Sequence, residues 1–331
     1  MKIRQYLLIY SFIFLCFALS GLTLLGKFDQ FGGVIKTNND AKNSSEVDES
    51  FLQSVDYYLV DNNRPVINFK SQNLTFSNAD AKVLGVKPEG VVFREFNLEP
   101  IHFKAEETKV NLKTKEVDLD SNVLVNVENV ELKSKKMKIS INTDSLAMVG
   151  DVQTLSTSKD GSEQILVTAN AADYQSRTKY FQYKNQVKGT FKRKKIYEES
   201  LRFASDLLNF DGLKNYAELK GNIHFTHGNY NVFANSGNVF LENYNKKLKY
   251  YSLSDDVRLE ERVESEGRIF TRKALSEKLE GFMSEKRIML TGLPKVFQDG
   301  DVIKGNTIII RENVETVEVD DANTNITLKR E

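Results

Sequence analysis

This chain of 331 residues has few side chains whose types and spacing could form a catalytic or metal-binding site. Of its three histidines, His224 and His227 have no cysteine and no suitable carboxylate pattern nearby, so they are better explained as a solvated strand edge than as a metal site. Acidic pairs at 255–256 and 320–321 fall in predicted turns, where Asp is common. The sequence contains neither a Gly-rich phosphate loop nor a Gly-x-Ser-x-Gly elbow. We therefore expect a protein that is not an enzyme and that uses no cofactor or metal.

Basic side chains gather in two places. One cluster is the run Lys192, Arg193, Lys194 and Lys195, and the other consists of four lysines between residues 133 and 138. Beside an opening, such cations could pair with phosphates or sugar acids of a lipid head group. On a strand edge they would instead oppose aggregation. Overall, 46 basic residues balance 46 acidic ones, so no global field draws the chain to nucleic acid or to anionic membranes.

The elements that must position any site follow from an internal repeat. The apolar residue Phe203 is followed by a small residue, Ser205, and then by the apolar residues Leu208 and Phe210. Sixteen residues after Phe203, a signature Leu-x-Gly-x-Ile begins at Leu219. Comparable signatures begin at positions 119, 148, 183, 253 and 290. A period of about 29 to 37 residues is typical of a stacked array whose units share one core.

Strand patterns dominate these repeats. Along residues 219–225, apolar residues fall on one face and polar residues on the other. In the preceding segment this alternation breaks between Ser205 and Leu208, which predicts a bulge or bend that lets one strand serve two sheets. The best helical pattern, at 272–279, falls where the other copies have a strand. We therefore predict an all-β fold of two stacked antiparallel sheets around an apolar seam.

The N-terminal segment has the features of an exported protein. Two basic residues precede 19 uncharged residues, 7–25, which is long enough for one membrane-spanning helix with its N-terminus in the cytoplasm. Ala18-Leu19-Ser20 resembles a cleavage site, so a cleaved signal peptide is the alternative, although the apolar run continues past it. Cys16, the one cysteine, lies here, so no disulfide can form within the chain. Residues 26–54, with many polar residues and glycines, are expected to form a flexible tether.

The C-terminal part resembles a known family. Residues 290–308, which read Leu-Thr-Gly-Leu-Pro-Lys-Val-Phe-Gln-Asp-Gly-Asp-Val-Ile-Lys-Gly-Asn-Thr-Ile, are similar to the C-terminal motif of the OstA-like proteins of lipopolysaccharide transport, LptA and its relatives. The Leu-x-Gly-Asn-Ile at 219–223 resembles that family's internal repeat. The order of cytoplasmic tip, membrane helix, tether and β-repeats is similar to LptC, the membrane-anchored member. The resemblance covers roughly residues 50–331.

The resemblance implies a fold, a location and a set of partners. The fold would be a β-jellyroll, open along one edge like a taco, with lipid acyl chains in its trough. An N-terminal segment 1–25 would anchor it in the inner membrane as a single-pass protein, and 26–54 would lead into the periplasm. Residues 55–195 would form an LptC-like jellyroll and 196–331 an LptA-like continuation. Partners would be lipopolysaccharide, an inner-membrane ABC transporter complex of the Lpt type, and other Lpt jellyrolls that pair end to end by their strands.

The apolar face of the repeats has two interpretations that periodicity cannot separate. It is either an ordinary packed core or, as the resemblance implies, a partly filled trough that binds lipid. A packed core would fit a membrane-tethered scaffold or stalk that binds only proteins. The residues expected to line a trough are Phe103, Leu119, Val123, Val167, Tyr183, Val187, Phe203, Leu219, Ile223, Phe225, Phe233, Leu290 and Ile308.

Overall fold

The structure is a computed structural model that describes residues 49–77, 81–95, 98–158, 161, 163–193, 201–242, 248–265, 267–311 and 314–320. The chain divides into two units, Met1–Glu46 and Val47–Glu331, and all described residues belong to the second. The membrane helix expected at 7–25 and most of the expected tether lie outside the described residues. Within the described ranges, no helix has the length and apolar character needed to cross a membrane.

The described part of the chain is all-β, as predicted. Residues 49–54 of the expected tether belong to the first strand, and 272–279 lie in a strand rather than a helix. The strands are β1 (Glu49–Asp61), β2 (Arg64–Ser77), β3 (Lys82–Val86), β4 (Glu89–Val92), β5 (Ile101–Lys104), β6 (Glu107–Asn111), β7 (Glu116–Val127), β8 (Val130–Ser140), β9 (Ser145–Thr157), β10 (Glu163–Gln175), β11 (Tyr180–Arg193), β12 (Leu201–Asp211), β13 (Tyr216–His227), β14 (Tyr230–Leu241), β15 (Leu248–Ser265), β16 (Arg268–Phe282), β17 (Arg287–Thr291), β18 (Lys295–Gln298), β19 (Asp301–Lys304), β20 (Thr307–Arg311) and β21 (Val317–Asp320).

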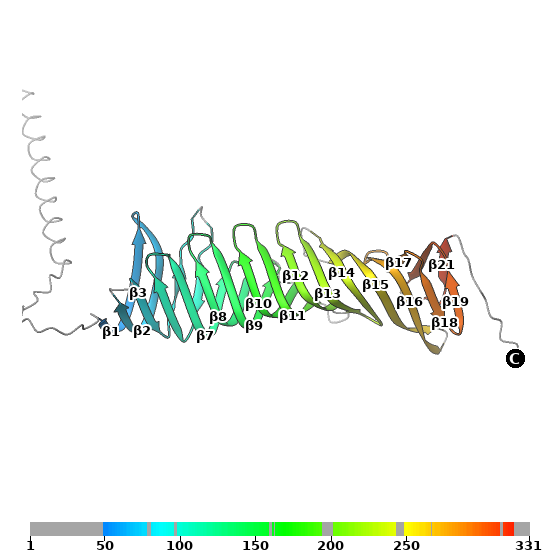
Figure 1. Ribbon diagram of the computed structural model, residues 1–331, viewed down its shortest axis with the longest axis horizontal. Helices are drawn as coiled ribbons and strands as arrows, with labels where there is room; N and C mark the ends of the chain where they lie inside the picture. The colour runs from blue at the N-terminus through cyan, green and yellow to red at the C-terminus, as the bar shows by residue number, and fades with distance from the viewer. Residues whose placement is uncertain are drawn as a thin grey trace, which may run out of the picture. The chain divides into compact units, whose positions relative to one another are not determined.

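All these strands belong to one sheet that is folded into two layers. From β7 to β16, each strand pairs antiparallel with the next one in the chain, so the strands lie side by side in chain order (Figure 1). The long strands β1, β2 and β7–β16 bend midway and contribute one half to each layer. Layer 1 also contains the short strands β4, β5, β18 and β19, and layer 2 contains β3, β6, β17, β20 and β21. The two sheets predicted from the sequence are therefore two halves of one folded sheet.

The layers join along a bent margin, here called the corner, and end at the opposite margin in turns. We call the turns of layer 1 "lip 1" and the turns of layer 2 "lip 2". Lip 1 includes residues 62–63, 93–95, 128–129, 228–229 and 299–300. Lip 2 includes residues 112–115, 141–144, 176–179, 212–215, 283–286 and 314–316.

The repeat signature encodes the corner. In alternate strands, two successive residues with positive φ follow the signature residue by two and three positions. These pairs are Ser121–Asn122, Gly150–Asp151, Asn185–Gln186, Gly221–Asn222, Asp255–Asp256 and Gly292–Leu293. Gly, Asn and Asp adopt this left-handed conformation more readily than other residues do. The strand ladders also shift register at these points in β7, β9, β11, β13 and β15.

The strands that alternate with these, β8, β10, β12, β14 and β16, bend beside a small buried residue. Ser134, Ser205 and Ser276 occupy this place in β8, β12 and β16, and alanine occupies it in β10 and β14. The Ser205 hydroxyl donates to the Leu207 carbonyl oxygen at 3.1 Å, which satisfies a backbone group where the ladder is interrupted. After the bend, Leu208 faces the interior again. The break in alternation predicted between Ser205 and Leu208 is confirmed.

One residue expected to line a trough, Phe233, lies on the outer face, as does Leu275 of β16. Phe233 is 38 % exposed and Leu275 is 43 % exposed, whereas their neighbours Val232 and Ala274 are buried. The prediction that Phe233 lines a trough is therefore wrong. Its ring stacks on His224 of the paired strand, with 4.5 Å between ring centroids. Because side chains alternate along a strand, an error of one residue in the alignment reverses the assigned face.

Candidate functional site

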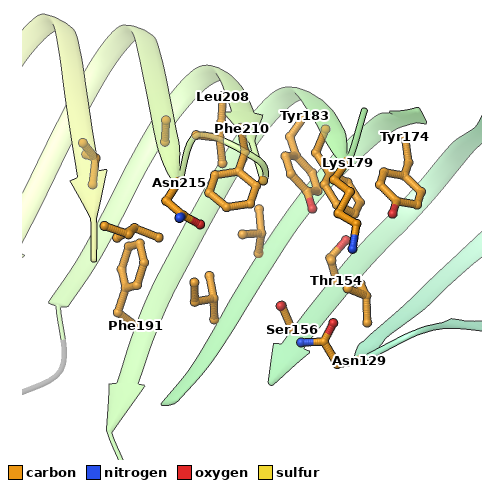
Figure 2. A pocket seen from close by; sticks show the side chains of 18 of the residues that line it. Asn129, Thr154, Ser156, Tyr174, Lys179, Tyr183, Phe191, Leu208, Phe210 and Asn215 are labelled. Atoms are coloured by element: carbon orange, nitrogen blue, oxygen red, sulfur yellow. The ribbon is translucent and has the colours of Figure 1, made fainter. Parts of the chain in front are cut away.

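A cavity of about 510 Å³ lies between the layers, from β9 to β14. Its walls come from both layers and are mainly aromatic and aliphatic. Figure 2 shows Tyr174, Tyr183, Leu208 and Phe210 on one side of the space, and Phe191, Ser156 and Asn129 on the other. A dry cavity of about 150 Å³ is enough for benzene. The space between these layers is therefore of the right order for one long acyl chain.

Small residues at inward positions create this space. Gly189 in β11 lies opposite Phe203 in β12, and a Cβ at Gly189 would come within 1.9 Å of the Phe203 ring. The ring thus lies flat against the glycine instead of reaching across the interior. On β13, Ala217 lines the cavity where a larger side chain would enter it.

The cavity reaches the lips. Glu128 and Asn129 of lip 1 line it, together with Lys179 and Asn215 of lip 2. The Lys179 Nζ lies 2.6 Å from the Glu128 carboxylate, so one ion pair joins the two lips at this end of the mouth. Each of these two side chains keeps some contact with solvent, and exposed pairs of this kind contribute at most about 1 kcal/mol.

A buried arginine reinforces the contact between the lips. The Arg94 side chain is 3 % exposed and lies 3.8 Å from the Asp144 carboxylate and 3.9 Å from that of Glu128. Its guanidinium also donates to the Ser176 hydroxyl of lip 2. Burial raises the pKa of the Asp144 carboxyl, and the charges of Arg94 and Arg177 oppose this shift. The charged groups of this region therefore lie at the lips.

The polar groups deeper in the cavity stay neutral. Burial raises the pKa of the Tyr183 hydroxyl well above its usual range, and it raises that of Tyr174 as well. Thr154 and Ser156 also contribute polar groups to the lining. Within the described residues, no group of three His, Cys, Asp or Glu side chains could hold a metal ion. The lining is therefore mainly apolar, with its charged groups at the lips.

The structure sorts the residues expected to line a trough into three groups. Val167, Tyr183, Phe203 and Leu219 line the cavity. Phe233 lies on the outer face. The others are buried in the seam between the layers but are not part of this cavity; they are Phe103, Leu119, Val123, Val187, Ile223, Phe225, Leu290 and Ile308.

The apolar space is confined to part of the seam. On the C-terminal side of the cavity, the interior is filled by Phe225 of β13, Tyr230 of β14 and Tyr251 of β15. The hydroxyls of the two tyrosines lie 3.1 Å apart across the layers. A second cavity, of about 680 Å³, lies nearer the N-terminal strands between residues of both lips, and Arg64, Arg94 and Asp144 are among its polar lining. Within the described residues, the seam therefore contains packed stretches as well as an apolar cavity.

The described side chains of the two basic clusters do not line the apolar cavity. Lys192 is exposed and follows Phe191, which lines the cavity, so the Lys192 side chain points outward. The side chains of Arg193, Lys194 and Lys195 lie outside the described residues. The lysines of the other cluster form ion pairs with carboxylates on exposed faces of β7, β8 and β9; the pairs include Lys133–Glu131, Lys135–Asp151, Lys136–Asp120 and Lys138–Glu116.

Sequence reasoning missed several residues of the cavity and its mouth. The alternation of the strands would have found Ile165, Phe181 and Ala217, because each shares a face with a residue already singled out. Glu128, Lys179 and Asn215 gave no such signal. They meet only because the fold brings distant turns together.

Comparison with known proteins identifies a similar family for part of the chain. Residues 203–316, roughly a third of the chain, match the family described as "LptA/(LptD N-terminal domain) LPS transport protein". Among the solved structures that match is LptH from Pseudomonas aeruginosa, described as the LptA homologous periplasmic component of the conserved lipopolysaccharide transport device. The identity is 19 %, the match covers 39 % of this chain and 89 % of LptH, and the TM-score is 0.33. No curated protein matches significantly.

Proposed function

We propose that this protein is a periplasmic component of lipopolysaccharide transport that binds an acyl chain of the lipid between its two layers. The apolar cavity of about 510 Å³ from β9 to β14 is the observation that carries the proposal. The family match supports it, because residues 203–316 include one wall of the cavity, from Phe203 to Leu241.

The binding we propose is physical and involves no covalent step. Each methylene that leaves water contributes about 0.8 kcal/mol, so a chain of modest length is held firmly by burial alone. The Tyr and Ser hydroxyls of the cavity could form hydrogen bonds with a few polar atoms of the lipid. Because burial has no preferred direction, an energy source elsewhere must drive transport outward. An inner-membrane ABC transporter complex of the Lpt type would supply it.

Anchoring and relay complete the proposal. Residues 7–25 would hold the chain in the inner membrane, with the strands in the periplasm. Strands β1 and β21 each pair on one side only, so each leaves a free edge within the described residues. Another jellyroll could add a strand at such an edge, which is a common mode of recognition. The lipid would then pass from one jellyroll to the next.

The alternative is a membrane-tethered scaffold that binds only proteins. The packed stretches of the seam favour it, since Phe225, Tyr251 and Leu290 leave no space around them for a ligand. On this alternative, the cavity would be a packing defect that holds no lipid.

Identification of the bound lipid separates the two proposals. The full-length protein is extracted in mild detergent from a bacterium that makes lipopolysaccharide, purified, and its bound lipids are identified by mass spectrometry. We expect lipopolysaccharide at close to one molecule per chain. A folded protein that carries no lipid, or only phospholipid, would favour the scaffold.

A further inference from the structure

A buried ion pair interrupts the apolar seam on the C-terminal side of the cavity. The side chains of Arg272 in β16 and Glu261 in β15 are 0 % and 1 % exposed, and their charged groups lie 3.1 Å apart. The guanidinium of Arg272 also donates to the Gln298 side-chain oxygen at 2.8 Å. Charged pairs are costly to bury, so their presence inside an apolar seam calls for a reason.

The repeat shows that this position is normally apolar. Arg272 comes four residues before the small residue of the bend, Ser276. The corresponding residues in β2, β8, β10, β12 and β14 are Ile67, Val130, Ile165, Leu201 and Tyr230. Packing of the layers alone therefore does not require an arginine at this place.

The arginine ties the two layers together at their open margin. It extends from layer 1 and donates to the carbonyl oxygens of Val314 and Glu315, in lip 2, at 2.8 Å and 2.9 Å. Gln298 donates to the same Glu315 carbonyl at 3.1 Å, and Arg268 forms an ion pair with the Glu315 side chain at 3.1 Å. These bonds hold the last described turn of lip 2 against layer 1.

A second arginine does the same on the N-terminal side of the cavity. Arg94 extends from lip 1 to Ser176 and Asp144 of lip 2. The cavity lies between the two contacts, and Tyr230 and Tyr251 fill the interior between the cavity and the Arg272 contact. In the order of the strands, the lip residues that line the cavity lie between the two arginine contacts. One of them, Leu213, is 61 % exposed.

We propose that the network of Arg272, Glu261, Gln298 and the 314–315 backbone is a latch that ends the ligand path on the C-terminal side. With the latch closed, the ligand occupies the cavity and exchanges sideways between the lips. It does not reach β18 to β21 until the 314–316 segment lifts from Arg272 and the layers part, which also separates Tyr230 from Tyr251. This inference rests on the proposed function, because it assigns a limit to the site where the lipid binds.

Spin labels on either side of the latch test the proposal. The full-length protein carries Cys16→Ser, which removes its one native cysteine, and a single label at Phe203→Cys or Ile303→Cys. Phe203 lines the cavity, and Ile303 packs against the core in β19, beyond the latch. Purified lipopolysaccharide is added, and electron paramagnetic resonance reports which label is immobilised. The measurement is repeated with Arg272→Leu and Glu261→Leu together, with the fold checked by circular dichroism.

We expect lipid to immobilise the label at 203 and not at 303 while the latch is intact, and to immobilise both labels in the double variant. Equal immobilisation at 303 with the latch intact would overturn the latch, whether or not the double variant folds. A folded double variant whose label at 303 stays mobile would overturn it too. Lipid that leaves the label at 203 unchanged would instead contradict the proposed function itself.

Discussion

At the scale of single residues, the interior is shaped by a few side chains that differ in size or charge from their counterparts in the repeat. Gly189 lets the Phe203 ring lie flat, and Ala217 leaves space beside it. Arg272 and Glu261 place charges where the other repeats are mostly apolar. Each of these deviations can be tested by restoring bulk or removing charge.

Filling the cavity should abolish lipid binding at little cost in stability. In Ala217→Phe, the added ring enters existing space, so we expect the bound lipopolysaccharide to fall more than tenfold. The matched control is Ala234→Phe, at a buried position that does not line the cavity. There we expect a loss of about 1 to 3 kcal/mol from overpacking. Urea unfolding of the detergent-solubilised full chain and lipid mass spectrometry measure the two effects, and undiminished lipid in folded Ala217→Phe would contradict the assignment.

Removing one half of the buried ion pair should cost more than removing both. Arg272→Leu removes the guanidinium that lies 3.1 Å from the buried Glu261 carboxylate, and we expect a loss of about 3 to 5 kcal/mol in the free energy of unfolding. Adding Glu261→Leu should recover most of this loss, since an apolar pair of similar volume is often neutral or stabilising. A double-mutant cycle by urea unfolding gives the coupling. Additive losses would show that the pair is not coupled.

At the scale of elements, the corner is the device that folds one sheet into two layers. Gly221 has a φ of +74°, and a Cβ there would approach the Asp206 carboxylate oxygen to 2.5 Å. At the equivalent points, Gly150 and Gly292 would meet Lys135 and Glu277. The outward side chain of one bend therefore packs against the corner of the next strand.

Gly221→Ala should be more destabilising than the same change at an open turn. A left-handed conformation costs an alanine about 1 to 2 kcal/mol, and at Gly221 the contact with Asp206 adds to this. Gly300 also has a positive φ, of +91°, but nothing lies within 4 Å of a Cβ placed there, so Gly300→Ala isolates the backbone effect. Thermal unfolding of both variants measures the difference. Equal losses would show that the corner contact is unimportant.

The elements were largely predictable, because period and alternation are properties of the sequence itself. The signature residues at Leu219 and Leu290 are buried, and the predicted bend after Ser205 exists. The orientation of Phe233 was predicted wrongly because the repeat was aligned on Phe233 and not on Val232, and a shift of one residue exchanges the two faces of a strand. The mouth was not predictable either. Glu128 and Lys179 are 51 residues apart, and only the stacking of hairpins brings them together.

At the scale of the whole β-unit, the inward side chains of the first strand, β1, are only partly covered. Val55, Tyr57 and Leu59 face the seam but remain half-buried, whereas Ile67 and Phe69 of the next strand are fully buried. Among the described residues, nothing covers the end of the seam at β1, which is the reason to expect another strand there.

A charge at this uncovered end should block strand addition. Tyr57→Lys places an ammonium at an inward position of the edge strand, a feature that discourages edge pairing. Tyr58→Lys is the matched control, because Tyr58 is 64 % exposed. A photo-crosslinking residue at Leu52 reports the contact in cells. We expect a protein adduct that is lost in Tyr57→Lys and retained in Tyr58→Lys. Circular dichroism checks that both variants are folded. An adduct that survives both changes would place the partner elsewhere.

Photo-crosslinking in living cells is the most direct test of lipid binding between the layers. The full-length protein carries a photo-crosslinking residue at Phe203, inside the cavity, or at Lys220, which is exposed on the outer face of the neighbouring strand. We predict an adduct with lipopolysaccharide at 203 and none at 220. The absence of a lipid adduct at 203 in a folded protein, or equal adducts at both positions, would contradict lipid transport through this cavity.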